Sequence, residues 1–333
     1  MARIPAPVAN VRGAVRQALK SGEPGPALGG PVLPGPVLVA CSGGADSLAL
    51  AAATAFVAAR LKVRAGLVTV DHQLQEGSAE RASAVADWAR SAGLDPVEVA
   101  TVEVGGRGGG PEAAAREARY EALSAAASRL GAVSVLLGHT RDDQAETVLL
   151  AMARGSGPRG VAGMPRRRGI FLRPLLDVSR ADTHKACAAL GLVAWEDPHN
   201  ADPAYARSRV RASALPALTA TLGPGVVANL ARTASLVAAD VAFLDDLARA
   251  ALLASRSAVG LRVSDLSDLN PAIRGRVLHA WALSLGAPGS ALSHRHVAAL
   301  DALVTGWHGQ GHTVLPGGIG VARQNGHLVR IGL

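Results

Sequence analysis

The clearest candidate for chemistry is the loop SGGADS, which follows the apolar run VLVAC and precedes an alanine- and leucine-rich stretch. This order predicts a strand, a tight turn and a helix. Two glycines and small hydroxyl residues let backbone N–H groups surround an anion, and the helix adds the positive end of its dipole. The loop lacks the lysine of a Walker A motif, so we expect a different way of holding phosphate. Its residues are Ser42, Gly43, Gly44, Ala45, Asp46 and Ser47.

A second group of charged residues lies in GHTRDDQAETVLLAMARGSG, residues 138–157. Asp143 and Glu146 are three positions apart on a predicted helix, so both carboxylates project from one face. Asp142 makes a neighbouring pair with Glu146. Acids in the first turn also complement the helix dipole, which accounts well for Asp142 and Asp143 and less well for Glu146. Beside a phosphate site, such a pair suits a cationic amine or Mg²⁺.

The elements that must position these residues alternate along the chain. Apolar runs and periodic patterns predict strands at 36–40, 65–70, 97–104 and 134–138, and helices at 45–60, 77–92, 111–130 and 142–154. The alternation predicts an α/β fold with a doubly wound parallel sheet, in which ligands bind beyond the carboxyl ends of the strands. Asp71 and His72 end the second strand, where such sheets contact nucleotides. A structural role for His72 is an equal alternative.

Three regions are expected. Residues 1–35 read as a flexible lead-in, because 21–36 are rich in proline and glycine. Residues 36–220 form the α/β domain, which continues after the alternation with a short strand in GIFLRPLL and further helices. Residues 221–333 predict a smaller, mainly helical domain with two or three short strands at its end, where Gly317-Gly318 and Asn325-Gly326 mark turns.

Composition narrows the class of protein. The formal net charge of +8 suits a polyanionic partner, although an arginine-rich composition also follows from a GC-rich genome. No apolar run is long enough for a membrane span, and the amino terminus does not resemble a signal peptide. Two cysteines, Cys41 and Cys187, exclude a disulfide framework and a four-cysteine zinc site. We therefore expect a cytoplasmic protein without membrane association.

Two other patterns are weaker. The stretch Gly155–Gly160 fits G-x-G-x-x-G, but it follows a predicted helix instead of a strand, so the dinucleotide reading fails. Four histidines near the carboxyl terminus do not fit a spacing known for metal ligands. These histidines are His294, His296, His308 and His312.

Several segments in order resemble one family. The loop SGGADS resembles the PP-loop of the ATP pyrophosphatase superfamily. The series SGGADS, VDHQLQEGS, EAAAREARY, GHTRDDQAETVLLAMARGSG, GVAGM, RPLL and WEDPHNADPAYARSRVR is similar to the tRNA(Ile)-lysidine synthetases of that superfamily. The similarity runs nearly continuously from residue 36 to about 218. The chain resembles the shorter members, which lack a further carboxyl-terminal domain.

This resemblance implies a reaction. The family uses ATP to adenylate the C2 oxygen of the wobble cytidine in tRNA(Ile) with anticodon CAU. The ε-amine of free L-lysine then displaces AMP and gives lysidine. ATP, lysine and this tRNA would be substrates and Mg²⁺ a cofactor. Dimerisation is common in the family, and the sequence itself gives no sign of a homodimer.

The resemblance also implies roles for residues. The SGGADS loop, Asp71 and His72 would bind ATP, and Asp46 would hold Mg²⁺. Asp143 and Glu146 would bind lysine, together with Arg116 or its helical neighbour Arg119. The resemblance assigns catalytic roles to Asp46, Arg116, Asp143 and Glu146. Arginines in later loops would contact the tRNA, with a solvated surface as the alternative; these are Arg166, Arg167, Arg168, Arg207 and Arg211.

At two positions the sequence departs from the residues common in this family, and other classes of protein are alternatives. The family commonly has histidine at Thr140 and asparagine at Ser208. Both changes are polar, so we expect activity to persist. A tRNA thiolase of the same superfamily typically uses a cysteine pair, and no C-x-x-C is present. A small-molecule amidotransferase or synthetase would lack the arginine-rich loops. A non-catalytic RNA-binding protein would not need an intact loop and acid pair.

Overall fold

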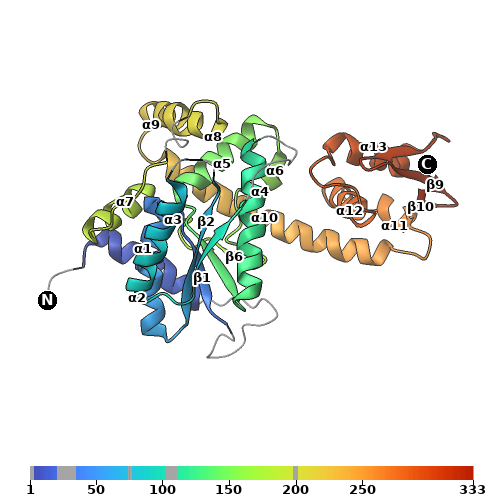
Figure 1. Cartoon of the computed structure of the whole chain (residues 1–333). Helices are drawn as coiled ribbons and strands as arrows, with labels where there is room; N and C mark the ends of the chain where they lie inside the picture. Colours follow the sequence, from blue (N-terminus) through green and yellow to red (C-terminus); the bar gives the residue numbers. More distant parts are fainter. Residues whose placement is uncertain are drawn as a thin grey trace. The chain divides into compact units, whose positions relative to one another are not determined.

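The computed structural model describes residues 4–20, 35–73, 75, 77–102, 111–197 and 202–332 (Figure 1). The chain divides into two compact units, Met1–Leu236 and Val237–Leu333, each with its own hydrophobic core. The division falls within the long helix α10 (Val226–Ser255), later than the expected boundary at residue 220. It does so because α10 is continuous from the first unit into the core of the second.

The first unit contains a six-stranded sheet in the order β3-β2-β1-β4-β6-β5. Its strands are β1 (Val37–Ala40), β2 (Ala65–Asp71), β3 (Val97–Thr101), β4 (Ser134–Leu137), β5 (Arg167–Arg168) and β6 (Phe171–Leu172). β1 pairs in parallel with both β2 and β4, and only the edge strand β5 is antiparallel. The strand order reverses direction between β1 and β4, which is where open sheets of this kind bind ligands. The predicted parallel α/β sheet is confirmed.

Helices cover both faces of this sheet (Figure 1). The helices of this unit are α1 (Ala6–Lys20), α2 (Ala45–Leu61), α3 (Ser78–Ser91), α4 (Pro111–Arg129), α5 (Arg141–Ala153), α6 (Gly157–Val161), α7 (Arg180–Ala189), α8 (Ala206–Arg209), the π-helix η2 (Val210–Ala214) and α9 (Leu215–Leu222). Of these, α2, α3 and α4 pack directly on the strands, and α1 and α7 pack on α2. Alternate residues of β1 face opposite layers. Val37 and Val39 pack in the core of α1, α2 and α7, whereas Leu38 and Ala40 pack with α4.

The amino-terminal region differs from the flexible lead-in expected over residues 1–35. Residues 6–20 form α1, which packs against α2 and α7. Val8, Val11 and Val15 recur at helical spacing and are fully buried. This apolar stripe anchors the helix. The proline- and glycine-rich residues 21–34 lie outside the described residues.

The second unit combines helices with an antiparallel sheet in the order β7-β10-β9-β8. Besides the end of α10, its elements are α11 (Val263–Ser267), α12 (Pro271–Ser284), α13 (His294–Thr305), β7 (Leu261–Arg262), β8 (Thr313–Leu315), β9 (Ile319–Gln324) and β10 (His327–Ile331). The terminal strands predicted from the sequence are present, and β7 adds a fourth. Asn325 and Gly326 both have positive φ at the β9–β10 turn, as a tight hairpin requires.

Two negative findings concern the described ranges only. Within them, no helix combines the length and the apolar character needed to cross a membrane. The same residues contain no group of three or more His, Cys, Asp or Glu side chains able to hold a metal ion.

Candidate active site

The SGGADS loop connects β1 to the amino end of α2 and is fixed by its own serines. The Ser47 hydroxyl accepts a hydrogen bond from the Ser42 backbone N–H at 3.2 Å and donates one to the Gly44 carbonyl at 2.9 Å. Gly43 has φ +84°, in the left-handed region, where a side chain would be strained. A β-carbon there would also lie 3.2 Å from Val85. The loop is thus a rigid turn at a helix amino terminus, the geometry expected for binding phosphate.

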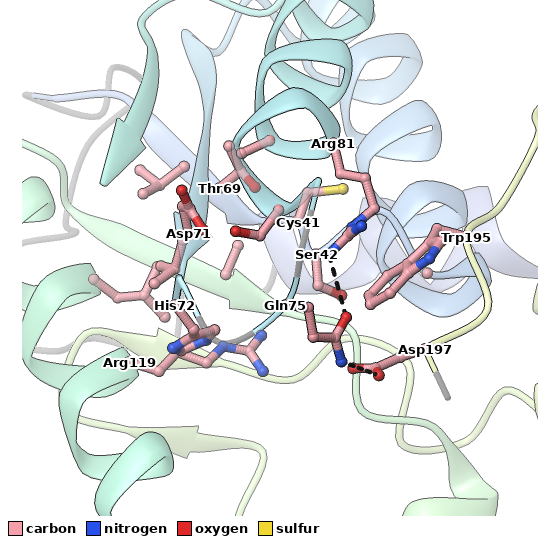
Figure 2. Close-up of a pocket in the computed structure, with 17 residues that line it drawn as sticks. Cys41, Ser42, Thr69, Asp71, His72, Gln75, Arg81, Arg119, Trp195 and Asp197 are labelled. Carbon is pink, nitrogen blue, oxygen red and sulfur yellow. Dashed lines mark hydrogen bonds between the residues drawn. The ribbon is translucent and has the colours of Figure 1, made fainter. Parts of the chain in front are cut away.

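A cavity of about 290 Å³ opens beside the loop, lined by the ends of β1 and β2, by α4 and by the segment around Trp195 (Figure 2). Both residues predicted after the second strand line it. Asp71 is buried and accepts a hydrogen bond from the Gln73 backbone N–H at 3.0 Å. His72 has a buried Nδ1 without a hydrogen-bond partner, and burial lowers its pKa. The cavity therefore combines the SGGADS loop with an imidazole whose burial disfavours the protonated form.

The structure separates the two arginines of α4. Arg119 lines the cavity, and burial lowers the pKa of its guanidinium, with a further contribution from Arg116. No acidic side chain among the described residues is within ion-pair distance of Arg119. Arg116 is exposed and lies over the Tyr120 ring at 5.2 Å. A partly buried guanidinium beside a loop of this kind suits a phosphate group. The predicted position of Arg116 beside Asp143 and Glu146 stays a prediction.

A further group of residues that line the cavity was not predicted from the sequence. Gln75 donates to Asp197 Oδ1 at 3.1 Å and accepts from Arg81 at 3.2 Å. Arg81 lies over the Trp195 ring at 4.4 Å, and the Trp195 backbone N–H donates to the Gly43 carbonyl at 3.0 Å (Figure 2). An aromatic face with nearby amide and carboxylate groups suits a nucleobase. A tryptophan in the polar segment WEDPHN was the available signal.

Asp143 and Glu146 lie together on α5, as their spacing predicts. Asp143 is fixed by a capping box, because its Oδ2 accepts from the Thr140 backbone N–H at 2.7 Å and from the Thr140 hydroxyl at 2.8 Å. Thr140 thus serves as the N-cap where the family commonly has histidine. Glu146 is completely buried. A buried carboxylate requires positive partners.

Those partners include Arg180, which the sequence analysis missed. Its guanidinium donates to Glu146 Oε1 at 3.1 Å and to Asp143 Oδ1 at 2.7 Å, and its Nε lies 3.7 Å from Asp46 Oδ2. Its backbone N–H donates to Asp142 Oδ2 at 2.8 Å. Arg180 begins α7, where the helix dipole disfavours a cation. An arginine at that unfavourable position was the signal that could have identified it.

Arg207 and Arg211 also reach the acid pair, although we expected them to contact tRNA. Arg211 donates from Nε to Glu146 Oε1 at 2.8 Å and from Nη2 to Glu146 Oε2 at 3.1 Å. Arg207 donates to the Thr147 hydroxyl at 3.1 Å, and its Nε lies 3.8 Å from Glu146 Oε2. We use the name acid cluster for Asp143 and Glu146 with these three arginines.

The structure places the remaining predicted tRNA contacts elsewhere. Arg167 and Arg168 form the edge strand β5, three strands away from β1. Arg166 pairs with Asp177, and Arg167 donates to the Gly169 carbonyl at 3.1 Å. Arg166 and Arg167 line a second cavity, of about 330 Å³, whose wall includes the first residues of β1 and β4. Its lining also includes Asn10 and Ala14 of α1, and it shares no residue with the cavity beside the SGGADS loop.

The surroundings shift the pKa values of Asp143, Asp46 and His139 in different directions. Burial would raise the pKa of Asp143, but Arg180, the Thr140 hydrogen bonds and His139 bring it below its usual value. Burial raises the pKa of Asp46, and the hydrogen bond from Thr183 and the charge of Arg180 only partly oppose this. Burial lowers the pKa of His139 to about 3, and Arg119 and Arg173 oppose the favourable charge of Asp143. Asp143 is therefore the ionised partner of this site, and His139 is neutral.

Asp46 fits a Mg²⁺ ion that arrives with a phosphate substrate. Its carboxylate lies on the first turn of α2 beside the loop, and its pKa is raised because burial is not fully compensated by neighbouring groups. Mg²⁺ in nucleotide sites is typically bound through one or two carboxylates together with substrate phosphates and water. The donor set around Asp46 suits such a shared ion and not a cage made by the protein alone.

The fold and this site define the class. A family described as PP-loop domain matches residues 28–218, and a family described as TilS substrate binding domain matches residues 261–329. A solved structure, the U34-tRNA thiolase NcsA from Methanococcus maripaludis with its 4Fe–4S cluster, has a TM-score of 0.54 at 17% identity. It covers 69% of this chain and 80% of its own, and it supports the fold alone. The first unit is thus a PP-loop domain.

Similar whole proteins define the family further. The chain is 65% identical to the tRNA(Ile)-lysidine synthase of Salinispora tropica, over 99% of this chain and 98% of the relative. It is 55% identical to the enzyme of the same name from Thermobifida fusca, over 98% of each. The chain belongs to the tRNA(Ile)-lysidine synthase family.

Proposed function

We propose that this protein ligates lysine to the C2 position of the wobble cytidine in tRNA(Ile) with anticodon CAU. ATP would first adenylate the C2 oxygen, forming a C2–O–P bond and releasing pyrophosphate. The neutral ε-amine of lysine would then attack C2, form the C–N bond and release AMP. The products are lysidine, AMP and pyrophosphate. Full-length similarity to the tRNA(Ile)-lysidine synthases supports this proposal.

The observation that carries it is the pairing of two subsites at one sheet edge. The SGGADS loop and its cavity follow β1 and β2, and the acid cluster follows β4. Asp46 joins them, because it belongs to the loop and lies 3.7 Å from Arg180. A site for a nucleotide next to buried carboxylates suits an adenylation followed by attack of an amine.

Each residue would have a distinct role. Backbone donors of the loop and Arg119 would stabilise negative charge that develops on the phosphates. Asp46 would hold Mg²⁺, which as a Lewis acid assists departure of pyrophosphate. Asp143 and Glu146 would orient the lysine, with Arg116 nearby. Exposed arginines such as Arg168 would contact the tRNA backbone.

One assay tests the proposal. Radiolabelled lysine, ATP and a tRNA(Ile) transcript with anticodon CAU are incubated with the full chain, and label in the RNA is measured. A transcript with anticodon GAU is the matched control. We expect labelling of the CAU transcript only. No labelling, or equal labelling of both, would reject the proposal.

A uridine or cytidine thiolase is the second candidate, and the observations do not favour it. The sequence has only two cysteines. Cys41 donates to the Ser47 hydroxyl at 3.5 Å, while Cys187 donates to the Ala45 carbonyl at 3.2 Å. Burial raises the pKa of both thiols, to about 11 for Cys187, so neither is an activated thiolate. Sulfur transfer into RNA in the same assay would favour this alternative.

A further inference from the structure

Every carboxylate oxygen of the acid cluster already accepts at least one hydrogen bond. Glu146 Oε1 accepts from Arg180 and Arg211, and Glu146 Oε2 accepts from Arg211. Asp143 Oδ1 accepts from Arg180 at 2.7 Å and from Arg211 at 3.4 Å, and its Oδ2 is occupied by Thr140. A further cation brought against this pair would be repelled by the three guanidinium groups of Arg180, Arg207 and Arg211 in a desolvated site. Lysine can therefore bind here only if one arginine leaves.

Arg211 is the arginine that can leave. Its side chain is 33% exposed, compared with 19% for Arg180. Arg180 also lies near Asp46 and donates through its backbone N–H to Asp142, whereas the guanidinium of Arg211 donates within the described residues to Asp143 and Glu146 alone. Arg211 lies in the π-helix η2, a distortion that is rare and frequently marks functional positions.

From this arrangement we propose that Arg211 closes the lysine subsite and that bound tRNA opens it. The proposal rests on the function proposed above. The reaction proposed above brings two kinds of phosphate to the protein, those of ATP, which the SGGADS loop and Arg119 would hold, and those of the RNA. A guanidinium binds phosphate with two parallel hydrogen bonds, and the RNA supplies the phosphates that the loop does not take. Arg211 exchanges the carboxylates of Asp143 and Glu146 for that phosphate, which frees both acids for the ε-ammonium of lysine. Arg180 stays and keeps the two carboxylates oriented.

The consequence is an order of binding. Lysine binds weakly to the protein alone and tightly to its complex with tRNA. Linkage requires the reciprocal effect, so lysine also strengthens tRNA binding by the same factor. Coupling between sites in proteins typically amounts to about 5- to 150-fold, and we expect a value on the order of tenfold here. Such an order keeps lysine from the adenylating site until the RNA is present.

Equilibrium dialysis with radiolabelled lysine tests this without ATP, so that no reaction occurs. The full chain and the variant Arg211→Met are compared with and without the CAU transcript. The wild type should bind lysine about tenfold more tightly when the transcript is present. Arg211→Met should bind lysine without RNA as tightly as the wild type binds it with RNA, because the methionine leaves the carboxylates free.

Arg209→Met is the matched control, because Arg209 is exposed and donates to the carbonyls of Pro203 and Ala204. It should behave as the wild type does. Protection of each variant by ATP against thermal unfolding verifies folding. Weaker or unchanged lysine binding by Arg211→Met overturns the proposal, as does wild-type binding that ignores RNA. Either result can occur in a protein that labels the CAU transcript, so it is distinguishable from failure of the proposed function.

Discussion

The two halves of the candidate site, the cavity beside the SGGADS loop and the acid cluster, differ in whether their charged side chains have partners. The cavity beside the SGGADS loop contains Arg119 without an acidic partner in the described chain, and His72 with an unpaired Nδ1. In the acid cluster, every oxygen of Asp143 and Glu146 has a donor. A partly buried cation without an acidic partner attracts an anion from solution, whereas a cluster in which every carboxylate oxygen has a donor disfavours further cations. The first half is therefore ready for its ligand, and the second must rearrange.

The largest expected effect comes from Asp46, which joins the two halves. Asp46→Ala should reduce tRNA-dependent AMP release by about 10³-fold, because groups that stabilise charge in the transition state contribute about 10² to 10³ in rate. Release of AMP and pyrophosphate measures the effect. Thr183→Val, which removes only the hydroxyl that bonds to Asp46, is the control and should cost much less. AMP release within threefold of the wild type would contradict the role given to Asp46.

A variant of Glu146 tests whether the acid cluster depends on the charge of this carboxylate. Glu146→Gln should destabilise the fold by about 3 kcal/mol, because it leaves Arg180 and Arg211 without their shared anion. It should also raise the lysine KM more than the ATP KM. Calorimetry and lysine titrations measure the two effects. Asp87→Asn, which removes an exposed carboxylate paired with Arg90, should change stability by less than about 1 kcal/mol. Equal losses for both variants would contradict the comparison.

Variants of Arg119 and Arg116 test which arginine of α4 contributes to the cavity beside the SGGADS loop. Arg119→Met should raise the ATP KM by about tenfold, since a hydrogen bond to a charged group contributes about 1.5–3 kcal/mol. Arg116→Met should leave the ATP KM near the wild-type value and, if Arg116 contacts lysine as predicted, raise the lysine KM. Steady-state kinetics with each substrate varied measures both. A larger effect of Arg116 on ATP would reverse the assignment.

Low pH should lower the stability that the acid cluster contributes to the fold. The pKa of Asp143 is lower in the folded chain than in the unfolded one, so below its ordinary value near 4 the unfolded state binds more protons. Stability from this group is present above that value and is lost as the pH falls toward the folded-state pKa. Denaturant unfolding between about pH 6 and pH 3 measures the loss. Asp143→Asn should flatten this dependence, and an unchanged slope would refute the ionised state of Asp143.

The smallest effect is expected at β5, far from both halves. If Arg168 contacts one phosphate of the tRNA, Arg168→Ala should lower the slope of log affinity against log salt by about 1. Affinities for ATP and lysine should not change. Filter binding of the CAU transcript at several salt concentrations measures the slope. An unchanged slope would favour the solvated-surface alternative for this arginine.

Much of the first unit is predictable because its signals are local. The runs at 36–40 and 65–70 give β1 and β2 within a residue, since apolar strands bounded by turns depend on neighbouring residues. The helix α1 was not predicted, because the proline- and glycine-rich residues 21–34 indicate a flexible segment. Val8, Val11 and Val15 are nevertheless spaced for a helix. Arg180 was missed because no nearby residue explains it. Its partner Glu146 is 34 positions away.

The sequence by itself determined the SGGADS loop, the strands and helices around it, and the placement of Asp143 and Glu146 on one face of a helix. These features follow from turn chemistry and helical period, which act over a few residues. Only the tertiary structure decided which cations meet the buried acids, with Arg180 and Arg211 filling the pair. It also put Arg119 and not Arg116 in the cavity beside the SGGADS loop, and Arg166 and Arg167 at a second, separate cavity. A buried carboxylate is compensated by whichever guanidinium packing brings within reach, and that choice depends on segments far apart in the chain.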